Sequence, residues 1–281
     1  LNTYRLLGRS GLRVSPLCLG TMTFGEEWGW GASKDECRGM FDLFCDQGGN
    51  FIDTANFYTN GTSEMMLGEF IAPKRDRLVI ATKYTLNMHR GDPNAGGNSR
   101  KNLVQSLEES LKRLRTSYID LFWVHMWDAL TPIEEVMRAL DDQVRLGKIR
   151  YVGFSDAPAW KVAQAQTIAQ LRGWTPFIGL QIEYNLIERT VERELVPMAL
   201  EFGLGITPWS PLSGGLLSGK YGSKKSTPPA DTAKRDMSKK LIPRNLEITD
   251  ALSKIAQKEN RSPAQVALNW LLQRPGVSSI I

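Results

Sequence analysis

Short apolar runs rich in strand-forming residues alternate along this chain with amphipathic stretches at helical spacing, and this alternation constrains the fold most. Strands alternating with helical patterns predict a parallel sheet, because every parallel connection needs a crossover. Eight repeats of the unit predict one α/β domain over residues 1–281, a (β/α)8 TIM barrel. The predicted strands are 17–20, 50–55, 78–83, 120–125, 151–155, 180–184, 204–209 and 277–281.

Three of the helical stretches carry clear start or stop signals. The stretch 99–115 begins with Ser99 and has basic residues in its last turn. Pro132 opens a helix over 133–146 that Gly147 closes, and Ser262 precedes a proline that opens another. The apolar face of 99–115 is formed by Leu103, Leu107, Leu111 and Leu114.

A doubly wound open sheet is the alternative α/β architecture. That fold ordinarily has a GxGxxG fingerprint after its first strand, whereas Gly20 here is followed by Thr-Met-Thr. The segment 5–14, with glycines at its centre, predicts an N-terminal β-hairpin that covers the bottom of the barrel. We further expect the C-terminal loop and helix after strand eight to be absent, because residue 281 ends that strand.

Composition excludes several classes of protein. Hydrophobic residues form 42% and charged residues 23% of the chain, as in ordinary globular proteins, and no apolar run reaches about 18 residues, so we expect no membrane span. Three cysteines without CxxC spacing and two histidines argue against a metal site. With no signal-peptide pattern at its start, the chain is expected to be cytoplasmic, reduced and metal-free.

The formal net charge of +5 comes from one segment. Residues 213–245 hold eight Lys and Arg against two Asp, so the rest of the chain is close to neutral. A nucleic-acid binder would interleave such charge with aromatic residues, and only Tyr221 is present, so no nucleic-acid partner is expected. The segment is either a solvated loop or an anion-binding one.

Four residues that can carry chemistry fall at or after the carboxyl ends of predicted strands, where barrel active sites lie. They are Asp53, Tyr58, Lys83 and His125. Each alone has an ordinary structural explanation, such as a loop cap, a packed aromatic, an ion pair or a core histidine. Together they suit proton donation to an oxygen: a lysine cation lowers a phenol pKa, and an aspartate keeps the lysine charged. The electrons would then come from an organic cofactor.

Ordered motifs along almost the whole chain resemble the aldo-keto reductase superfamily. The segments are 53–58 (DTANFY), 81–83 (ATK), 123–125 (WVH), 153–156 (GFSD), 181–185 and 209–212 (WSPL). The similarity is strongest to the bacterial reductases that also resemble potassium-channel β-subunits. The resemblance implies an NADPH-dependent oxidoreductase that reduces small aldehydes or ketones to alcohols.

The resemblance also assigns roles to residues. Tyr58 is implied to be the general acid, polarised by Lys83 paired with Asp53, while His125 orients the substrate carbonyl. Asp156 departs from the family's usual Asn, so it would accept the carboxamide NH₂ while Ser155 donates. The implied cofactor-binding residues are Gly20, Thr21, Met22, Ser155, Asp156, Gln181, Trp209, Ser210, Leu212, Gly214 and Lys220.

Two tryptophans are candidates for the substrate pocket. Trp28 lies on the glycine-rich loop after the first strand, where it either lines an apolar pocket or packs within its own loop, and Trp127 follows His125 closely. Two other functions stay open at this level. The same barrel can act as an NADPH-binding redox sensor with little turnover, or Lys83 can form a Schiff base as in an aldolase, which requires a neutral amine.

Overall fold

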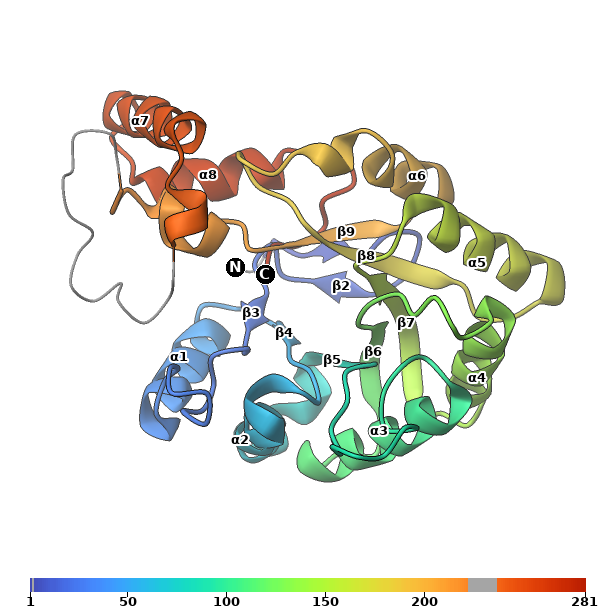
Figure 1. The fold of residues 1–281 in the computed structure, drawn as a ribbon. Coiled ribbons are helices and arrows are strands. Elements are labelled where there is room, and N and C mark those ends of the chain that lie inside the picture. The colour runs from blue at the N-terminus through green and yellow to red at the C-terminus, as the bar shows by residue number, and fades with distance from the viewer. Residues whose placement is uncertain (2, 222–236) are drawn as a thin grey trace.

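The computed structural model describes residues 1, 3–221 and 237–281, and its centre is a curled parallel sheet (Figure 1). Seven strands follow one another in sequence order, each paired in parallel with the next. They are β3 (Leu19–Gly20), β4 (Phe51–Asp53), β5 (Val79–Tyr84), β6 (Ile119–Val124), β7 (Ile149–Ser155), β8 (Phe177–Glu183) and β9 (Gly205–Trp209).

The predicted eighth strand closes this sheet through bridges on both of its sides. Val277 pairs in parallel with Ile206 of β9, and Ile280 pairs with Leu17, just before β3. The amide of Cys18 donates to the Ile280 carbonyl at 2.7 Å. The segment 277–281 therefore takes the place of strand eight, and the predicted α/β barrel is confirmed. An open doubly wound sheet is excluded by this closure.

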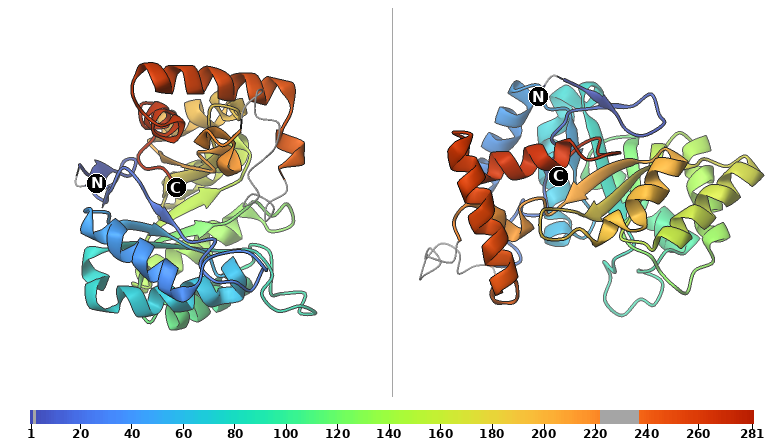
Figure 2. Two further views of the ribbon diagram at one scale, coloured as in Figure 1. Left: turned by 90° about the vertical axis from the view of Figure 1, so that its left-hand side faces the viewer. Right: turned by 90° about the horizontal axis from the view of Figure 1, so that it is seen from above.

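Helices surround the barrel, as two further views show (Figure 2). They are α1 (Lys34–Asp46), α2 (Thr62–Ile71), α3 (Arg100–Arg113), α4 (Ile133–Arg145), α5 (Ala159–Arg172), α6 (Leu195–Phe202), α7 (Pro243–Lys258) and α8 (Pro263–Leu272). The predicted start signals are confirmed: Ser99 caps α3 through the amide of Asn102, and Ser262 forms a capping box at α8. None of the described helices is long and apolar enough to cross a membrane.

The predicted hairpin is β1 (Arg5–Leu6) paired antiparallel with β2 (Arg13–Val14). Its turn packs where β8 and β9 begin, because the Arg9 amide donates to the Gly203 carbonyl at 2.7 Å. Gly8 has φ +57, and a Cβ there would lie 2.4 Å from the Ile178 carbonyl oxygen, so only glycine fits this close approach. The hairpin thus closes the bottom of the barrel, opposite the carboxyl ends of the strands.

The inside of the barrel is filled around Trp123, a fully buried side chain of β6. Space for its indole comes from glycines on the next two strands. A Cβ on Gly153 would lie 2.3 Å from Trp123 Cζ3, and one on Gly179 would lie 2.9 Å from Trp123 Cη2. A large residue facing small ones is how barrel layers reach interior packing density. This layer supports the strand ends that carry the polar residues described next.

We predict that Gly153→Ala lowers the free energy of unfolding by about 1–3 kcal/mol, because the added methyl group overpacks the barrel against Trp123. Gly39→Ala is the matched control. Gly39 lies in α1 with nothing within 4 Å of an added Cβ, so the same change there should stabilise the protein by about 0.5–1 kcal/mol. Urea unfolding measures both. Equal stability of the two variants would contradict the packing of Trp123 against Gly153.

Candidate active site

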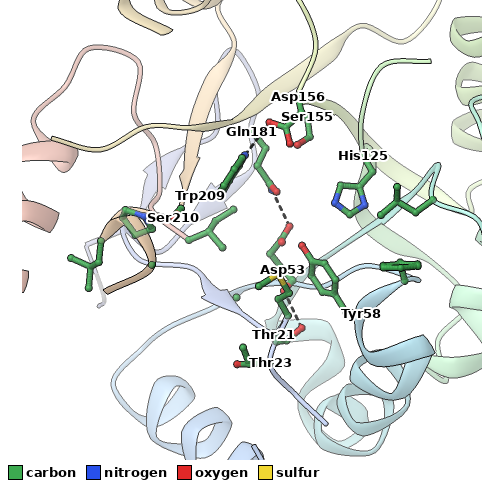
Figure 3. Close-up of a pocket in the computed structure, with 18 of the residues that line it drawn as sticks. Thr21, Thr23, Asp53, Tyr58, His125, Ser155, Asp156, Gln181, Trp209 and Ser210 are labelled. Atoms are coloured by element: carbon green, nitrogen blue, oxygen red, sulfur yellow. Dashed lines mark hydrogen bonds between the residues drawn. The ribbon is translucent and has the colours of Figure 1, made fainter. Parts of the chain in front are cut away.

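A cavity of about 590 Å³ opens at the carboxyl ends of the strands (Figure 3). Its walls come from most of the strand ends and from the loops after β3 and β9. The residues lining it include Gly20, Thr21, Met22, Trp28, Asp53, Phe57, Tyr58, Leu86, His125, Ser155, Asp156, Gln181, Trp209, Ser210, Leu212, Gly214, Gly215 and Ile281. Most of the predicted site residues therefore meet in one place.

The Lys83 ammonium, beneath the cavity floor, has an acceptor for each of its three N–H bonds. It donates to the Asp53 carboxylate, to the Thr54 carbonyl at 2.8 Å and to Tyr58 Oη at 3.1 Å. Lys83 is 0% exposed and Asp53 only 2%, so water competes for none of these bonds. Neighbouring parallel strands bring the lysine and the carboxylate together, since Asp53 ends β4 and Lys83 lies in β5.

These contacts decide the charge of the lysine. Burial by itself lowers the pKa of Lys83, but Asp53 and Tyr58 outweigh it and raise that pKa above its ordinary value. Gln181 Nε2 donates to the other Asp53 oxygen at 3.1 Å and holds the carboxylate in place (Figure 3). Lys83 is therefore a fixed cation. The Schiff-base alternative needs a neutral amine, and this site works against one.

Tyr58 follows β4 on the 3-10 turn η1 (Tyr58–Gly61), and its hydroxyl lies between Lys83 and the cavity. The sequence predicts a lowered phenol pKa, but burial outweighs the effect of Lys83 and raises the pKa of Tyr58 above its ordinary value. Tyr58 is thus a neutral phenol at physiological pH. Its oxygen accepts from Lys83, so its own O–H bond must point away from the ammonium.

His125 directly follows β6, and its ring meets that of Tyr58 edge-on, with centroids 5.9 Å apart. Burial, reinforced by the Lys83 charge, lowers the pKa of His125 to about 3. The imidazole is therefore neutral and carries one N–H. Its Nδ1 atom is buried without a hydrogen-bond partner in the described structure, so the proton is better placed on Nε2.

The turn that carries Tyr58 has three successive left-handed residues, Thr59, Asn60 and Gly61, with φ of 46°, 56° and 94°. This conformation is unfavourable for a β-branched residue. The Thr59 hydroxyl compensates by donating to the Phe24 carbonyl at 2.6 Å and accepting from the Ser63 amide at 3.1 Å. Sequence reasoning missed this support, which ties the turn to the loop after β3 and to α2.

A buried hydroxyl cluster lies beneath the same wall of the cavity. Ser63 Oγ is 2.8 Å from Thr21 Oγ1 and 2.9 Å from Thr54 Oγ1. Thr21 Oγ1 also donates to the Asp53 carbonyl at 3.1 Å. Ser63 and Thr54 are residues that the sequence did not single out. They bind Thr21, predicted to contact the cofactor, to the strand that ends in Asp53.

Trp209, the last residue of β9, forms the wall opposite Tyr58 (Figure 3). Its Nε1–H donates to Asp156 Oδ1 at 3.0 Å, which is a contact that the sequence did not predict. Ser155 and Gln181 line the cavity beside this pair. Hydrogen-bond donors and acceptors that could bind an amide thus lie beside the flat indole of Trp209. A nicotinamide needs this combination, because it has an aromatic ring and a carboxamide group.

The loop after β9 lines the cavity with Gly214 and Gly215. Ser213, Gly214 and Gly215 are all left-handed, with φ of 50°, 71° and 100°, and a Cβ on Gly215 would meet nothing within 4 Å. Two of these backbone N–H groups are already used within the loop, because Ser213 donates to the Ser210 carbonyl at 2.9 Å and Gly215 donates to the Leu212 carbonyl at 3.0 Å. The polar and aromatic residues of the cavity therefore fit a nicotinamide ring.

The basic segment contributes less than predicted among its described residues. Lys220 is exposed and does not line the cavity. Lys240 instead donates to Ser213 Oγ at 3.2 Å and lies 3.6 Å from a Glu183 oxygen, next to the left-handed loop. Four basic residues of this segment lie outside the described residues: Lys224, Lys225, Lys234 and Arg235.

The two candidate tryptophans differ in position. Trp28 lines the cavity and also packs on Trp30 of its own loop, with ring centroids 5.8 Å apart, so its two proposed arrangements coexist. Trp127 is not among the cavity-lining residues. It packs against Trp160 of α5, with ring centroids 5.5 Å apart. Leu86, which sequence reasoning missed, lies in the cavity wall.

Comparison with known proteins agrees with this geometry. Residues 16–281 match the model of the "Aldo/keto reductase family". An aryl-alcohol dehydrogenase from Pestalotiopsis microspora is 40% identical over 293 residues, covering 100% of this chain and 74% of that protein. A norsolorinic acid reductase from Aspergillus flavus is 39% identical, covering 98% of this chain and 71% of that protein. An aryl-alcohol dehydrogenase [NADP(+)] from Phanerodontia chrysosporium is 38% identical, covering 94% of this chain and 73% of that protein.

The match spans the barrel from just before β3 to its closing segment, and it includes every strand that contributes to the cavity. These relatives are all named as oxidoreductases, which agrees with a cavity built for proton donation beside an aromatic platform. This chain therefore belongs to the aldo/keto reductase family, and it is an NAD(P)H-dependent oxidoreductase of that family.

Proposed function

We propose that this protein reduces the carbonyl group of small aldehydes or ketones to the alcohol with NADPH, and that Tyr58 is the general acid. The arrangement of the Tyr58 hydroxyl carries the proposal. Its oxygen accepts a hydrogen bond from Lys83 at 3.1 Å, so its O–H is left to donate into the cavity. A donor fixed in advance at the position where negative charge develops is the most effective catalytic element for such a reaction.

The reaction needs a hydride and a proton. When bound, the nicotinamide supplies the hydride to the carbonyl carbon. Tyr58 then transfers its proton to the carbonyl oxygen as negative charge develops there. The fixed ammonium of Lys83 stabilises the phenolate that remains, because a buried cation 3.1 Å away favours the charged form of the phenol.

His125 is proposed to orient the substrate. A neutral imidazole protonated on Nε2 donates one hydrogen bond to the carbonyl oxygen without competing with Tyr58 as an acid. The lowered pKa keeps the ring in this state throughout the physiological range. Tyr58 and His125, edge-on with centroids 5.9 Å apart, thus provide two donors at one oxygen position.

The cavity wall supports an aromatic substrate. Trp28, Phe57 and Leu86 give the side near Tyr58 an apolar surface. Two of the relatives are named for aryl alcohols and a third for norsolorinic acid. We therefore propose aryl aldehydes and ketones as the substrate class of this chain.

Tyr58→Phe removes the proposed acid and should lower kcat for an aryl aldehyde by about 10²–10⁴-fold, the usual contribution of a positioned acid. The affinity for NADPH, measured by fluorescence titration, should stay within about twofold of wild type. Tyr4→Phe is the control, since Tyr4 is exposed, lies outside the cavity and donates its hydroxyl to the Gly48 carbonyl. Wild-type turnover in the Tyr58 variant would reject the assignment. A wild type limited to one turnover would favour the redox-sensor alternative.

The neutral state of His125 predicts a pH dependence of stability. The pKa of His125 is lowered to about 3 in the folded protein, so on acidification the unfolded chain takes up this proton at a higher pH than the folded protein does. Stability therefore falls as the pH drops below about 6.5. As the pH falls from 7.5 to 5.5, His125 should lower the free energy of unfolding by about 1 kcal/mol. His125→Gln has no group that titrates in this range. Urea unfolding at the two pH values should therefore show that wild type loses about 1 kcal/mol more of its free energy of unfolding than the variant does. Identical losses would mean that folding does not lower the pKa of His125.

NADPH should bind about tenfold more tightly than NADH, since a 2′-phosphate adds charge-assisted hydrogen bonds. The preference should shrink as ionic strength rises, because salt screens exposed charges. Titration of protein fluorescence with both dinucleotides at low and high salt tests this. If NADPH and NADH bind with equal affinity, and neither affinity changes with salt concentration, the basic segment has no role in binding the cofactor.

A further inference from the structure

Asp156 occupies a backbone position that leaves little freedom. It directly follows β7 and has φ +45, in the left-handed region that Asp, Asn and Gly tolerate best. Its amide donates to the Gln181 carbonyl at 3.2 Å, and its carbonyl accepts from the Trp127 amide at 3.3 Å. With the main chain held on both sides, only the side-chain torsions remain to be set.

The Asp156 side chain is directed to Trp209 across the cavity mouth (Figure 3). Its Oδ1 accepts the indole Nε1–H at 3.0 Å. An indole has a single polar atom, so this is the one conventional hydrogen bond that Trp209 can make. A hydrogen bond on one edge of the ring restrains rotation of the indole plane about the side-chain torsions. Backbone restraint comes from β9 on one side and from Ser210, with φ +54, on the other.

We propose that Asp156 is a positioning residue that holds the Trp209 indole as the flat wall of the cavity against which the nicotinamide ring stacks. The inference rests on the proposed function for the identity of the ring. The choice of residue follows from hydrogen-bond chemistry. An ionised carboxylate only accepts, so it presents an acceptor to the indole in either orientation of its oxygens. The hydrogen bond with an ionised acceptor is also the stronger kind.

The experiment compares two ligands in variants of the full chain. Asp156→Gly deletes the carboxylate and keeps a residue that accepts φ +45. It should weaken NADPH binding about three- to tenfold, because binding must then also order the freed Trp209 indole. Binding of 2′-phospho-ADP-ribose, which lacks the nicotinamide, should stay within about twofold of wild type. Isothermal titration calorimetry measures both ligands.

Two further variants separate a positioning role from a general structural one. Asp156→Asn keeps an acceptor oxygen and should restore most of the NADPH affinity. Trp209→Phe keeps an aromatic ring without the N–H donor, so adding Asp156→Gly to it should cause little further loss. In the ligand-free protein, Asp156→Gly should change the near-ultraviolet circular dichroism in the bands that Trp209→Phe also alters.

Three results would overturn the proposal. They are wild-type NADPH affinity in Asp156→Gly, equal loss of both ligands in that variant, and additive losses in the double variant. Failure of the proposed function looks different, because wild type itself would then bind no NADPH. In that case the circular dichroism of the ligand-free variants still decides whether Asp156 orders Trp209.

Discussion

The site depends on one buried ammonium group with three acceptors. Lys83 contacts the Asp53 carboxylate, the Thr54 carbonyl and Tyr58 Oη, and it has no other donor to offer. A buried cation is tolerable only when it is paired and fully hydrogen-bonded. The contact with Asp53 meets that requirement, and the contact with Tyr58 gives it a chemical use. Removal of any acceptor would leave a charged donor unsatisfied inside the barrel.

Other features of the barrel maintain this arrangement. Gln181 on β8 reaches across to the second Asp53 oxygen, so the ion pair is braced from the opposite side of the barrel. The Thr59 hydroxyl holds the left-handed turn after Tyr58. Below, the Trp123 indole packs where Gly153 and Gly179 leave room for it. These contacts join strands far apart in sequence, which makes the position of the Tyr58 hydroxyl a property of the closed barrel.

Much of this organisation was predictable because it follows from local chemistry. Seven of the eight predicted strands and the capping serines of α3 and α8 occur where the residue pattern places them. Since strand ends in a parallel barrel meet at one face, Asp53, Lys83 and His125 were predictable as neighbours. The eighth strand differs from the prediction, because residues 277–281 pair through isolated bridges on both sides and do not form a regular strand.

Other features depend on burial and distance, which a linear sequence does not contain. The direction of the Tyr58 pKa is one example. A neighbouring lysine predicts a lowered value, but the extent of desolvation decides the balance and raises it. The packing of Trp127 on Trp160 and the hydrogen bond from the Trp209 indole to Asp156 are two more examples, because both follow from loop conformation.

The barrel, its hairpin and the set of residues at its carboxyl face could be predicted from the chain alone, because periodicity and strand order are properties of neighbouring residues. How these residues share hydrogen bonds and protons depends on the folded structure. Whether a phenol is an acid, an imidazole is neutral or a carboxylate holds an indole depends on which donors lie within about 3 Å and how much water is excluded. Those quantities exist only once the barrel has closed.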